Sequence, residues 1–148
     1  RMIKLYEISQ AEALITCNKT PTNELYQYGV AKIYQKNNFI YLKDLIEKPT
    51  PGTAPSNLTN ISKYIFTPKI FEIIEQQIPN PVSKELYITD SIAQIAKQFS
   101  VVVHLPKGKY LDGGNLLGWL KANLVIAKSK PKLYQQLSEF IKKEWLEK

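Results

Sequence analysis

The chain has 148 residues, of which 20 are basic, 13 are acidic and 44% are hydrophobic, so its net charge is +7. This length and hydrophobic content fit a single globular domain over residues 1–148 with a buried core. No segment approaches the roughly 20 consecutive apolar residues of a membrane span. Residues 1–20 also lack the pattern of a signal peptide. We therefore expect a cytoplasmic protein with no membrane association.

Charge distribution and cysteine content exclude further classes of protein. The basic side chains are scattered singly or in pairs, and no basic cluster is interleaved with aromatic residues that could stack on bases. We therefore predict no nucleic-acid partner. Because Cys17 is the only cysteine, one chain can form neither a disulfide nor a cysteine-based zinc site.

The first part of the chain is predicted to contain a helix and a buried strand. Residues 1–8 have helical spacing but no capping signal before them, which suggests the tail of an element that began upstream. Residues 13–17 form a short apolar run bounded by polar residues, which indicates a buried strand. A polar connection is expected over residues 20–27.

Two β-rich runs, residues 28–35 and 39–46, are predicted to pair as a hairpin. Residues 36–38 between them contain two asparagines, which tolerate the left-handed backbone of a tight turn. This hairpin places residues 47–49 at the end of its second strand. A loop stiffened by proline follows over residues 50–56.

The middle of the chain is predicted to form one strand and two helices. Residues 60–66 are the strand, and Thr67 followed by Pro68 is a favourable start for a helix that ends near Pro79. The apolar stripe of that helix consists of Ile70, Phe71, Ile73, Ile74 and Ile78. Residues 83–90 carry start signals for the second helix. Its buried face is expected to consist of Ile88, Ile92, Ile95, Ala96 and Phe99.

The last third of the chain is predicted to add a strand over residues 100–105 and two helices, one over residues 116–128 and one opening at Pro131. His104 lies on that strand, and a single histidine at a strand end is more often packed or solvated than catalytic. The apolar face of the last helix would cover a core or form a subunit contact. Alternating strands and helices indicate the α/β or α+β class.

A carboxylate followed by two glycines stands before the first of these helices, in residues 110–115. The pattern predicts that Asp112 is presented at a strand-to-helix junction, with Asn115 as the helix cap. Such a carboxylate suits magnesium that carries phosphate, because magnesium usually takes one or two carboxylates together with phosphate oxygens. The alternative is that Asp112 only helps to start the helix.

Several short motifs share their order and spacing with one known family. They are Tyr28-Gly29-Val30, Ile46-Glu47-Lys48-Pro49, Ala54-Pro55-Ser56-Asn57-Leu58, Tyr64, Thr67-Pro68-Lys69-Ile70-Phe71, Glu85 with Ile88-Thr89-Asp90, and Leu111-Asp112-Gly113-Gly114-Asn115 with Gly118. In this order they resemble the C-terminal half of the bacterial UTP-glucose-1-phosphate uridylyltransferases, also called UDP-glucose pyrophosphorylases, which are sugar nucleotidylyltransferases.

The resemblance implies a particular fold, and it implies that the chain is a fragment of a longer enzyme. The expected fold is the C-terminal sugar-binding part of a Rossmann-like nucleotidyltransferase, with a mixed β-sheet, a β-hairpin and flanking helices. The chain contains no Gly-rich phosphate loop of the Walker or dinucleotide kind. We therefore expect that the N-terminal nucleotide-binding part is missing and that the chain is inactive alone. The full-length enzyme is expected to be a homo-oligomer.

The resemblance also implies the roles of five residues. Gly29 and Glu47 would hold the sugar, Lys48 would grip the sugar phosphate, Asn57 would bind substrate, and Asp112 would bind Mg2+. Lys48 and Asp112 are the expected catalytic residues. The chemistry agrees, since a carboxylate can accept hydrogen bonds from two neighbouring hydroxyls, and a lysine is a point charge suited to phosphate.

The implied substrates are UTP and glucose 1-phosphate, and the products are UDP-glucose and pyrophosphate. The chain departs from the family at three places. Residues 59–63 stand where the family has an apolar stretch ending in Gly-Arg, Gly113 replaces a cysteine, and Leu116 replaces a charged residue.

Three alternatives remain open. The base specificity could be that of a thymidylyltransferase or another sugar nucleotidylyltransferase, because the base-reading half has no counterpart in this chain. The chain could instead be a non-catalytic module that binds sugar nucleotides or mediates assembly through its terminal helices. A nucleic-acid-binding domain ranks last, and it would require an affinity that falls steeply with salt.

Overall fold

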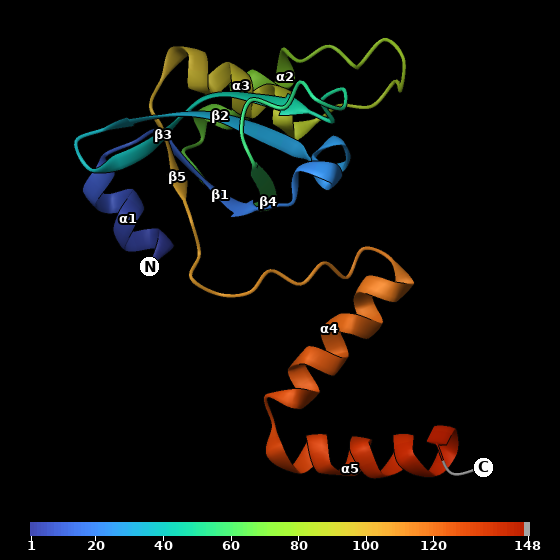
Figure 1. Cartoon of the computed structure of the whole chain (residues 1–148). Helices are drawn as coiled ribbons and strands as arrows, with labels where there is room; N and C mark the ends of the chain where they lie inside the picture. Colours follow the sequence, from blue (N-terminus) through green and yellow to red (C-terminus); the bar gives the residue numbers. More distant parts are fainter. Residues whose placement is uncertain (147–148) are drawn as a thin grey trace. The chain divides into compact units, whose positions relative to one another are not determined.

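The computed structural model describes residues 1–146 and forms two compact units, residues 1–107 and residues 108–148 (Figure 1). The expectation of one domain over residues 1–148 stays a prediction. No helix of the described residues is long and apolar enough to cross a membrane.

The first unit contains five strands, three α-helices and a 3-10 helix. In chain order these are α1 (Met2–Ser9), β1 (Ala13–Lys19), η1 (Thr22–Gln27), β2 (Gly29–Lys36), β3 (Phe39–Glu47), β4 (Leu58–Phe66), α2 (Lys69–Glu75), α3 (Ile88–Gln98) and β5 (Val101–His104). The predicted helix at the start, the hairpin, the strands and the two central helices are confirmed, but Phe71 and Ile78, expected on the apolar stripe of the first central helix, are exposed. The polar connection before the hairpin is itself helical.

Two details at α2 differ from the sequence-based expectation. The helix ends at Glu75 rather than near Pro79, and Thr67 does not cap it, since no side chain caps its first turn. The Thr67 hydroxyl instead donates to the Glu12 carboxylate, which also forms an ion pair with Lys69 at 3.7 Å. The Thr67 hydroxyl is therefore bonded to a residue far away in sequence, and not to the first turn of α2 as the local sequence pattern suggested.

The five strands form one mixed sheet in the order β1-β4-β2-β3-β5, which closes on itself because β5 also pairs with β1. The β1–β5 pair is parallel, with Ala13–Thr16 opposite Val101–His104, and the other pairs are antiparallel. The predicted mixed sheet with a hairpin and flanking helices is thus observed.

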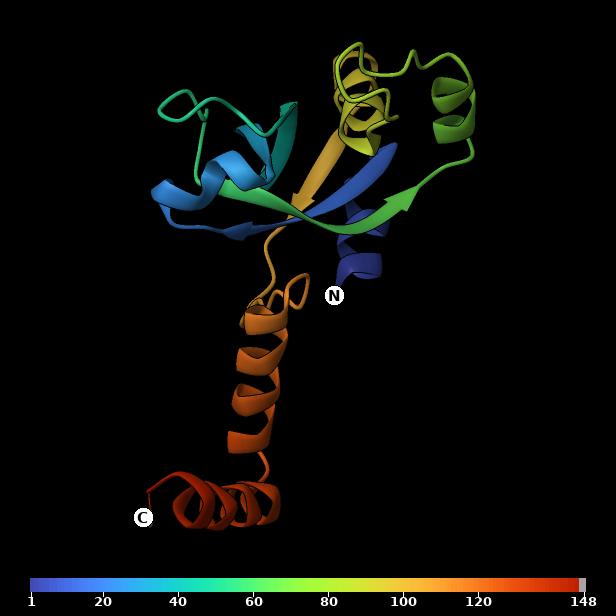
Figure 2. The same ribbon diagram turned by 90° about the vertical axis from the view of Figure 1, so that its right-hand side faces the viewer.

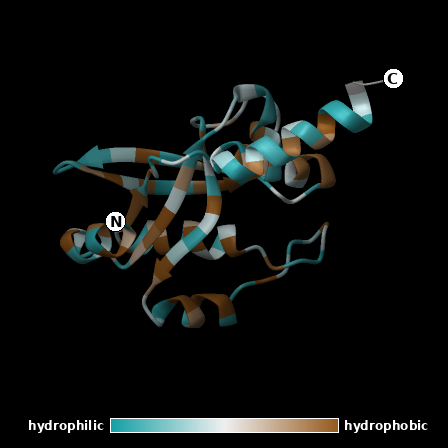
Figure 3. Cartoon of the chain, turned by 90° about the horizontal axis from the view of Figure 1, so that it is seen from below, coloured by the Kyte–Doolittle hydropathy of each residue, from teal (hydrophilic) through white to brown (hydrophobic). Residues whose placement is uncertain are grey.

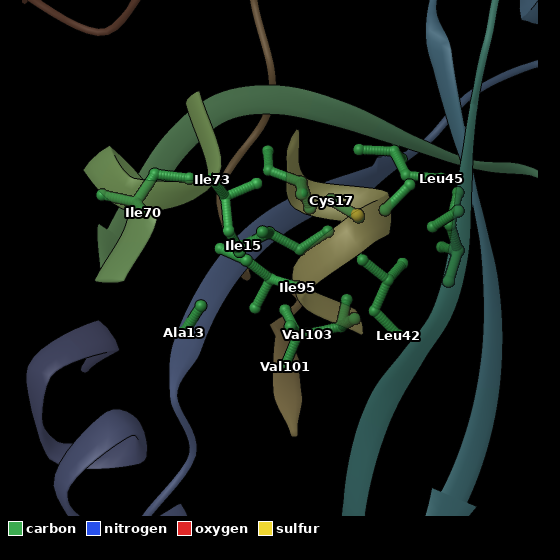
Figure 4. Packing of buried hydrophobic residues seen from close by; sticks show 14 residues of the cluster. Ala13, Ile15, Cys17, Leu42, Leu45, Ile70, Ile73, Ile95, Val101 and Val103 are labelled. Carbon is green, nitrogen blue, oxygen red and sulfur yellow. The ribbon is translucent and has the colours of Figure 1, made fainter. Parts of the chain in front are cut away.

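Both faces of the β1–β5 pair are covered. On one face, α2 and α3 pack on the alternate strand residues that Figure 4 shows, including Ala13, Ile15, Val101 and Val103. On the other face, α1 packs on the residues between them, Leu14 and Val102. A strand buried on both faces has a continuous apolar run rather than an alternating one, which explains the pattern of residues 13–17. Burial in this core raises the pKa of the Cys17 thiol to about 12, so the thiol is inert.

The hairpin turn follows from its two asparagines. Asn37 has φ 50° and Asn38 has φ 64°, and a two-residue turn of this kind requires positive φ at both central positions. The turn sets the register of the strand residues next to it, and a bulge between Lys32 and Ile33 then shifts the pairing by one residue, so that Gly29 pairs with Glu47 at the open end of the hairpin. That pairing positions the site described below.

The second unit consists of α4 (Leu116–Lys128), α5 (Pro131–Ile141) and a short π-helical turn, η2 (Lys142–Leu146). Asn115 caps α4 as predicted, because its Oδ1 accepts from the backbone N–H of Gly118 at 2.8 Å. Pro131 is the first residue of α5, also as predicted. In Figure 3, hydrophobic bands recur along the helix that leads to the C-terminus. Within α4 and α5, Ala127 is the one buried residue. Subunit contact therefore stays open as a role for the last helix.

Candidate functional site

The open end of the hairpin forms one wall of a small cavity of about 230 Å³. Its lining comes from β2, β3, β4 and the start of α3, and includes Gly29, Glu47, Asn60, Tyr64, Tyr87 and Thr89. In Figure 2, α2, α3 and the hairpin lie on the same side of the long strand β4, whereas α1 lies on the other side. The predicted residues Gly29 and Glu47 are therefore brought together, on rigid elements.

Gly29 is favoured by close approach rather than by its backbone angle. A Cβ placed on Gly29 would lie 3.0 Å from Cγ2 of Thr89 and 3.1 Å from Oε2 of Glu47. A side chain there would require the Thr89 methyl and the Glu47 carboxylate to move by a few tenths of an ångström. The missing side chain thus allows a carboxylate and a hydroxyl-bearing side chain to converge at one end of the cavity.

Thr89 is the residue that sequence reasoning missed. It is 6% exposed, and its Oγ1 is a buried oxygen with no hydrogen-bond partner among residues 1–146. An unpartnered buried hydroxyl costs on the order of 1–3 kcal/mol. The Thr89 atom that lies closest to Gly29 is the Cγ2 methyl, and the Oγ1 oxygen is closed off from solvent. The motif Ile88-Thr89-Asp90 was visible in the sequence, but the burial of Thr89 results from the packing of α3 against the hairpin.

The opposite wall is held by hydrogen bonds within β4. Asn60 Nδ2 donates to the Tyr64 hydroxyl oxygen at 2.6 Å, and Asn60 Oδ1 accepts from the backbone N–H of Ser62 at 3.3 Å. Ser62 has φ 54°, so the strand bends there. These contacts lie in the segment where the sequence departs from its family, and they give the cavity a polar wall.

Lys48 lines an adjoining cavity of about 650 Å³ and not the smaller one. The two cavities share Glu47 and Tyr87, and the larger one is also lined by Asp44, Asp90, Gln94 and Lys97. Glu47 thus lines both spaces, whereas Lys48 lines only the larger of these two.

Asn57 is not brought together with Gly29 and Glu47. It lies in a third cavity, between η1 and the loop after β3, whose other walls include Leu25, Tyr26 and Pro49. That cavity shares no residue with the small one. The Asn57 carbonyl accepts from the backbone N–H of Thr20 at 2.9 Å. The predicted role of Asn57 in substrate binding stays a prediction.

Asp112 belongs to the second unit, and the strand expected before it is absent. β5 ends at His104, and residues 105–115 contain no strand. The expected strand-to-helix junction is therefore wrong, because the two apolar residues before Asp112 pair with no other strand. Asp112 Oδ1 instead accepts from the backbone N–H of Gly114 at 2.8 Å. Burial and the Asp112 charge raise the pKa of the Tyr110 phenol.

The Asp112 turn packs directly on the first turn of α4. A Cβ on Gly118 would lie 2.3 Å from the carbonyl oxygen of Asp112, so only glycine fits at this helix position. Together with the Asn115 cap, this contact fixes the backbone that carries the carboxylate.

The turn at Asp112 contains one carboxylate that could bind a metal ion. Among the described residues, no group of three or more histidine, cysteine, aspartate or glutamate side chains could hold a metal ion. A complete protein cage is thus missing from residues 1–146. A single carboxylate still fits magnesium, which keeps waters and takes phosphate oxygens as further ligands.

The family model of the nucleotidyl transferases matches residues 1–129, and the chain belongs to this family. Within it, the chain is similar to UTP–glucose-1-phosphate uridylyltransferases. It is 32% identical over 143 residues to that of Staphylococcus haemolyticus, covering 96% of this chain and 49% of the relative. It is 34% identical over 132 residues to a putative one from Methanocaldococcus jannaschii, covering 88% of this chain and 46% of the relative.

Solved structures give the same result. A UDP-glucose pyrophosphorylase complexed with UDP-glucose aligns with a TM-score of 0.79 at 32% identity, over 87% of this chain and 49% of that chain. A UTP-bound enzyme from Acinetobacter baumannii aligns with a TM-score of 0.77, over 95% of this chain and 48% of that one. The chain spans about half the length of the relatives it matches. The resemblance to half of such an enzyme is confirmed.

The contact between Gly118 and Asp112 predicts different effects for two glycine substitutions. Gly118→Ala should destabilise α4 by about 1–3 kcal/mol, because the new methyl group overlaps the Asp112 carbonyl. Gly113→Ala should be neutral or slightly stabilising, since no atom lies within 4 Å of a Cβ there. Amide hydrogen exchange across α4 measures both effects. Equal protection of α4 in the two variants would contradict the role of Gly118.

Proposed function

We propose that this chain carries the sugar-phosphate half of the active site of a UTP–glucose-1-phosphate uridylyltransferase. The observation that supports this most is the small cavity that Gly29, Glu47 and Thr89 line together, with a Thr89 hydroxyl oxygen that has no partner among residues 1–146. Relatives at 32% identity have been solved with UDP-glucose and with UTP, which supports the same ligands here.

The lining chemistry suits a hexose. A carboxylate accepts hydrogen bonds from two neighbouring hydroxyl groups, and Glu47 is the acid in this cavity. The Thr89 hydroxyl can both donate and accept. Asn60 and Tyr64 add a polar wall that is already ordered by their mutual bond. Because these groups are fixed before binding, little ordering cost falls on the complex.

The reaction we propose for the complete enzyme is a nucleotidyl transfer. A phosphate oxygen of glucose 1-phosphate forms a bond to the α-phosphorus of UTP, and the bond from that phosphorus to the bridging oxygen of pyrophosphate breaks. UDP-glucose and pyrophosphate are the products. Such reactions depend on positioning and charge neutralisation rather than on a covalent nucleophile.

Two residues of this chain would serve that chemistry. Lys48 would bind the phosphate of the sugar phosphate as a point charge. Asp112 would hold Mg2+, which, when bound, neutralises phosphate charge. Glu47 and Gly29 would orient the sugar so that its phosphate faces the nucleotide. The binding of UTP itself needs residues that this half-length chain does not supply, and we propose that the chain is inactive alone.

Pyrophosphate release tests this proposal. The longest natural polypeptide that contains this sequence should release pyrophosphate from UTP and glucose 1-phosphate with Mg2+, whereas the 148-residue chain should not. Asp112→Ala in the longer polypeptide should abolish most of the release. Activity with dTTP but not with UTP would show that the reaction is thymidylyl transfer rather than uridylyl transfer. No activity with any nucleoside triphosphate would contradict a transferase.

The unpartnered Thr89 hydroxyl predicts an unusual pair of effects. Thr89→Val keeps the shape of the side chain and should leave the free energy of unfolding unchanged or raise it, because the hydroxyl has no partner to lose. The variant should bind glucose 1-phosphate roughly two- to tenfold more weakly, since it loses one hydrogen bond. Urea unfolding and calorimetric titration measure the two quantities.

A matched control is Thr59→Val. Thr59 is equally buried, but its Oγ1 lies 2.6 Å from Oγ1 of Thr20 and donates to the Asn18 carbonyl. This variant should therefore lose stability without a specific loss of sugar binding. If Thr89→Val behaved in the same way, Thr89 would be a structural residue only.

A second function, assembly through the terminal helices, is favoured by one observation. Large hydrophobic side chains of α4 and α5 are exposed, among them Leu116, Leu117, Trp119, Leu124, Leu133, Tyr134 and Phe140. Exposed apolar patches of this kind mark interaction sites. This agrees with the homo-oligomer expected for the full-length enzyme.

Sedimentation tests this second function. The native chain should self-associate with rising concentration, and Phe140→Lys should shift it towards the monomer, because a charge would be buried in the contact. Lys132→Glu on the same helix is a control for surface charge. A native chain that stays monomeric at all concentrations would contradict assembly by these helices alone.

A further inference from the structure

The backbone at Lys48 has an uncommon conformation for a lysine. Its φ is 43°, in the left-handed region that residues other than glycine, asparagine and aspartate seldom adopt. Its backbone N–H donates to the Tyr28 carbonyl at 3.1 Å, and Pro49 follows directly, which restricts Lys48 further. The direction in which the Lys48 side chain leaves the hairpin is therefore set by the fold.

The Lys48 ammonium lies over an aromatic ring. Its Nζ is 5.8 Å from the centroid of the Tyr87 ring, within the distance at which a cation is attracted to a ring face. The same cavity holds the carboxylates of Asp44 and Asp90. No ion pair within 4.0 Å joins Lys48 to either of them in the part of the chain that the structure describes. The ring holds an ammonium that could otherwise pair with an acid.

The backbone of Tyr87 is anchored to the core. Its carbonyl accepts from Gln77 Nε2 at 2.8 Å and from the backbone N–H of Asp90 at 3.1 Å. Gln77 Oε1 in turn accepts from the hydroxyl of Ser91 at 2.6 Å, and Ser91 is fully buried in α3. A network in which each polar atom is bonded keeps its members in one arrangement. The backbone from which the Tyr87 ring extends is thus held in place, and Tyr87 lines both cavities.

We propose that Tyr87 is a positioning residue for Lys48: its ring separates the two cavities and holds the ammonium on the side of the larger one. The sugar then lies with Gly29, Glu47 and Thr89 in the smaller cavity, and its phosphate lies against Lys48 across the edge of the ring. This inference rests on the proposed function for the identity of the ligand.

The position of Lys48 can be measured without any ligand. In a lysine-labelled chain, the ε-methylene protons of Lys48 should resonate upfield of those of other lysines, because they lie over the ring. The shift should persist in Tyr87→Phe and disappear in Tyr87→Leu. Tyr34→Leu, which removes a tyrosine from the hairpin outside both cavities, is the matched control. An unshifted Lys48 resonance in the native chain would overturn the proposal.

A double-mutant cycle then separates positioning from other roles. Tyr87→Leu should weaken glucose 1-phosphate binding roughly two- to fivefold, the range of a partly exposed cation–π contact, and Tyr87→Phe should restore it. In a Lys48→Met background, Tyr87→Leu should cause no further loss, because the two residues act through one interaction.

The outcomes distinguish the two proposals. Equal losses from Tyr87→Leu in both backgrounds would overturn positioning, since the ring would act on the sugar or on the fold. Weakening by Lys48→Met alone, with no effect of Tyr87→Leu, would overturn the role of Tyr87 and leave the proposed function standing. A native chain that does not bind glucose 1-phosphate would overturn the proposed function itself, while the resonance of Lys48 still decides whether Tyr87 holds it.

Discussion

The first unit depends on the parallel pairing of β1 with β5. These strands are separated by most of that unit in sequence, yet Leu14 and Ile15 lie opposite Val102 and Val103. All four residues are buried, and fully burying side chains of this kind contributes roughly 1.5–3 kcal/mol each. The pair closes the sheet. It provides one face on which α1 packs and another on which α2 and α3 pack, and this packing places the start of α3 at the open end of the hairpin.

The candidate site is a consequence of that arrangement together with one register. The asparagine turn and the bulge between Lys32 and Ile33 together pair Gly29 with Glu47, and α3 brings the Cγ2 methyl of Thr89 close to Gly29. Three elements thus place a carboxylate, a threonine and a bare backbone around one small space. The close packing at Gly29 favours a residue without a side chain.

Local patterns predicted the elements well, because they are set by neighbouring residues. The turn at Asn37 and Asn38 and the cap at Asn115 are examples. Predictions that depended on distant residues were less successful. The Thr67 hydroxyl donates to Glu12 rather than to the first turn of α2, and the segment before Asp112 forms no strand.

The site could be predicted only in part, because some of its features depend on local motifs and others on contacts between distant residues. Gly29 and Glu47 carried recognisable motifs, and the structure places them together. The orphaned hydroxyl of Thr89 could not be foreseen, since its burial results from contact between α3 and the hairpin. Nor could the sequence show that Lys48 lies over Tyr87 in an adjoining cavity, because the two residues are far apart in sequence and meet only when α3 packs on the hairpin.

The central claim is that the small cavity binds the sugar of a sugar phosphate, and amide chemical-shift mapping of this chain with glucose 1-phosphate tests it most directly. The account predicts saturable shifts at Gly29, Glu47 and Thr89, with the amides of Leu25 and Asn57 in the third cavity unchanged. Saturable shifts confined to Leu25 and Asn57, or no saturable shift at Gly29, Glu47 and Thr89, would contradict it.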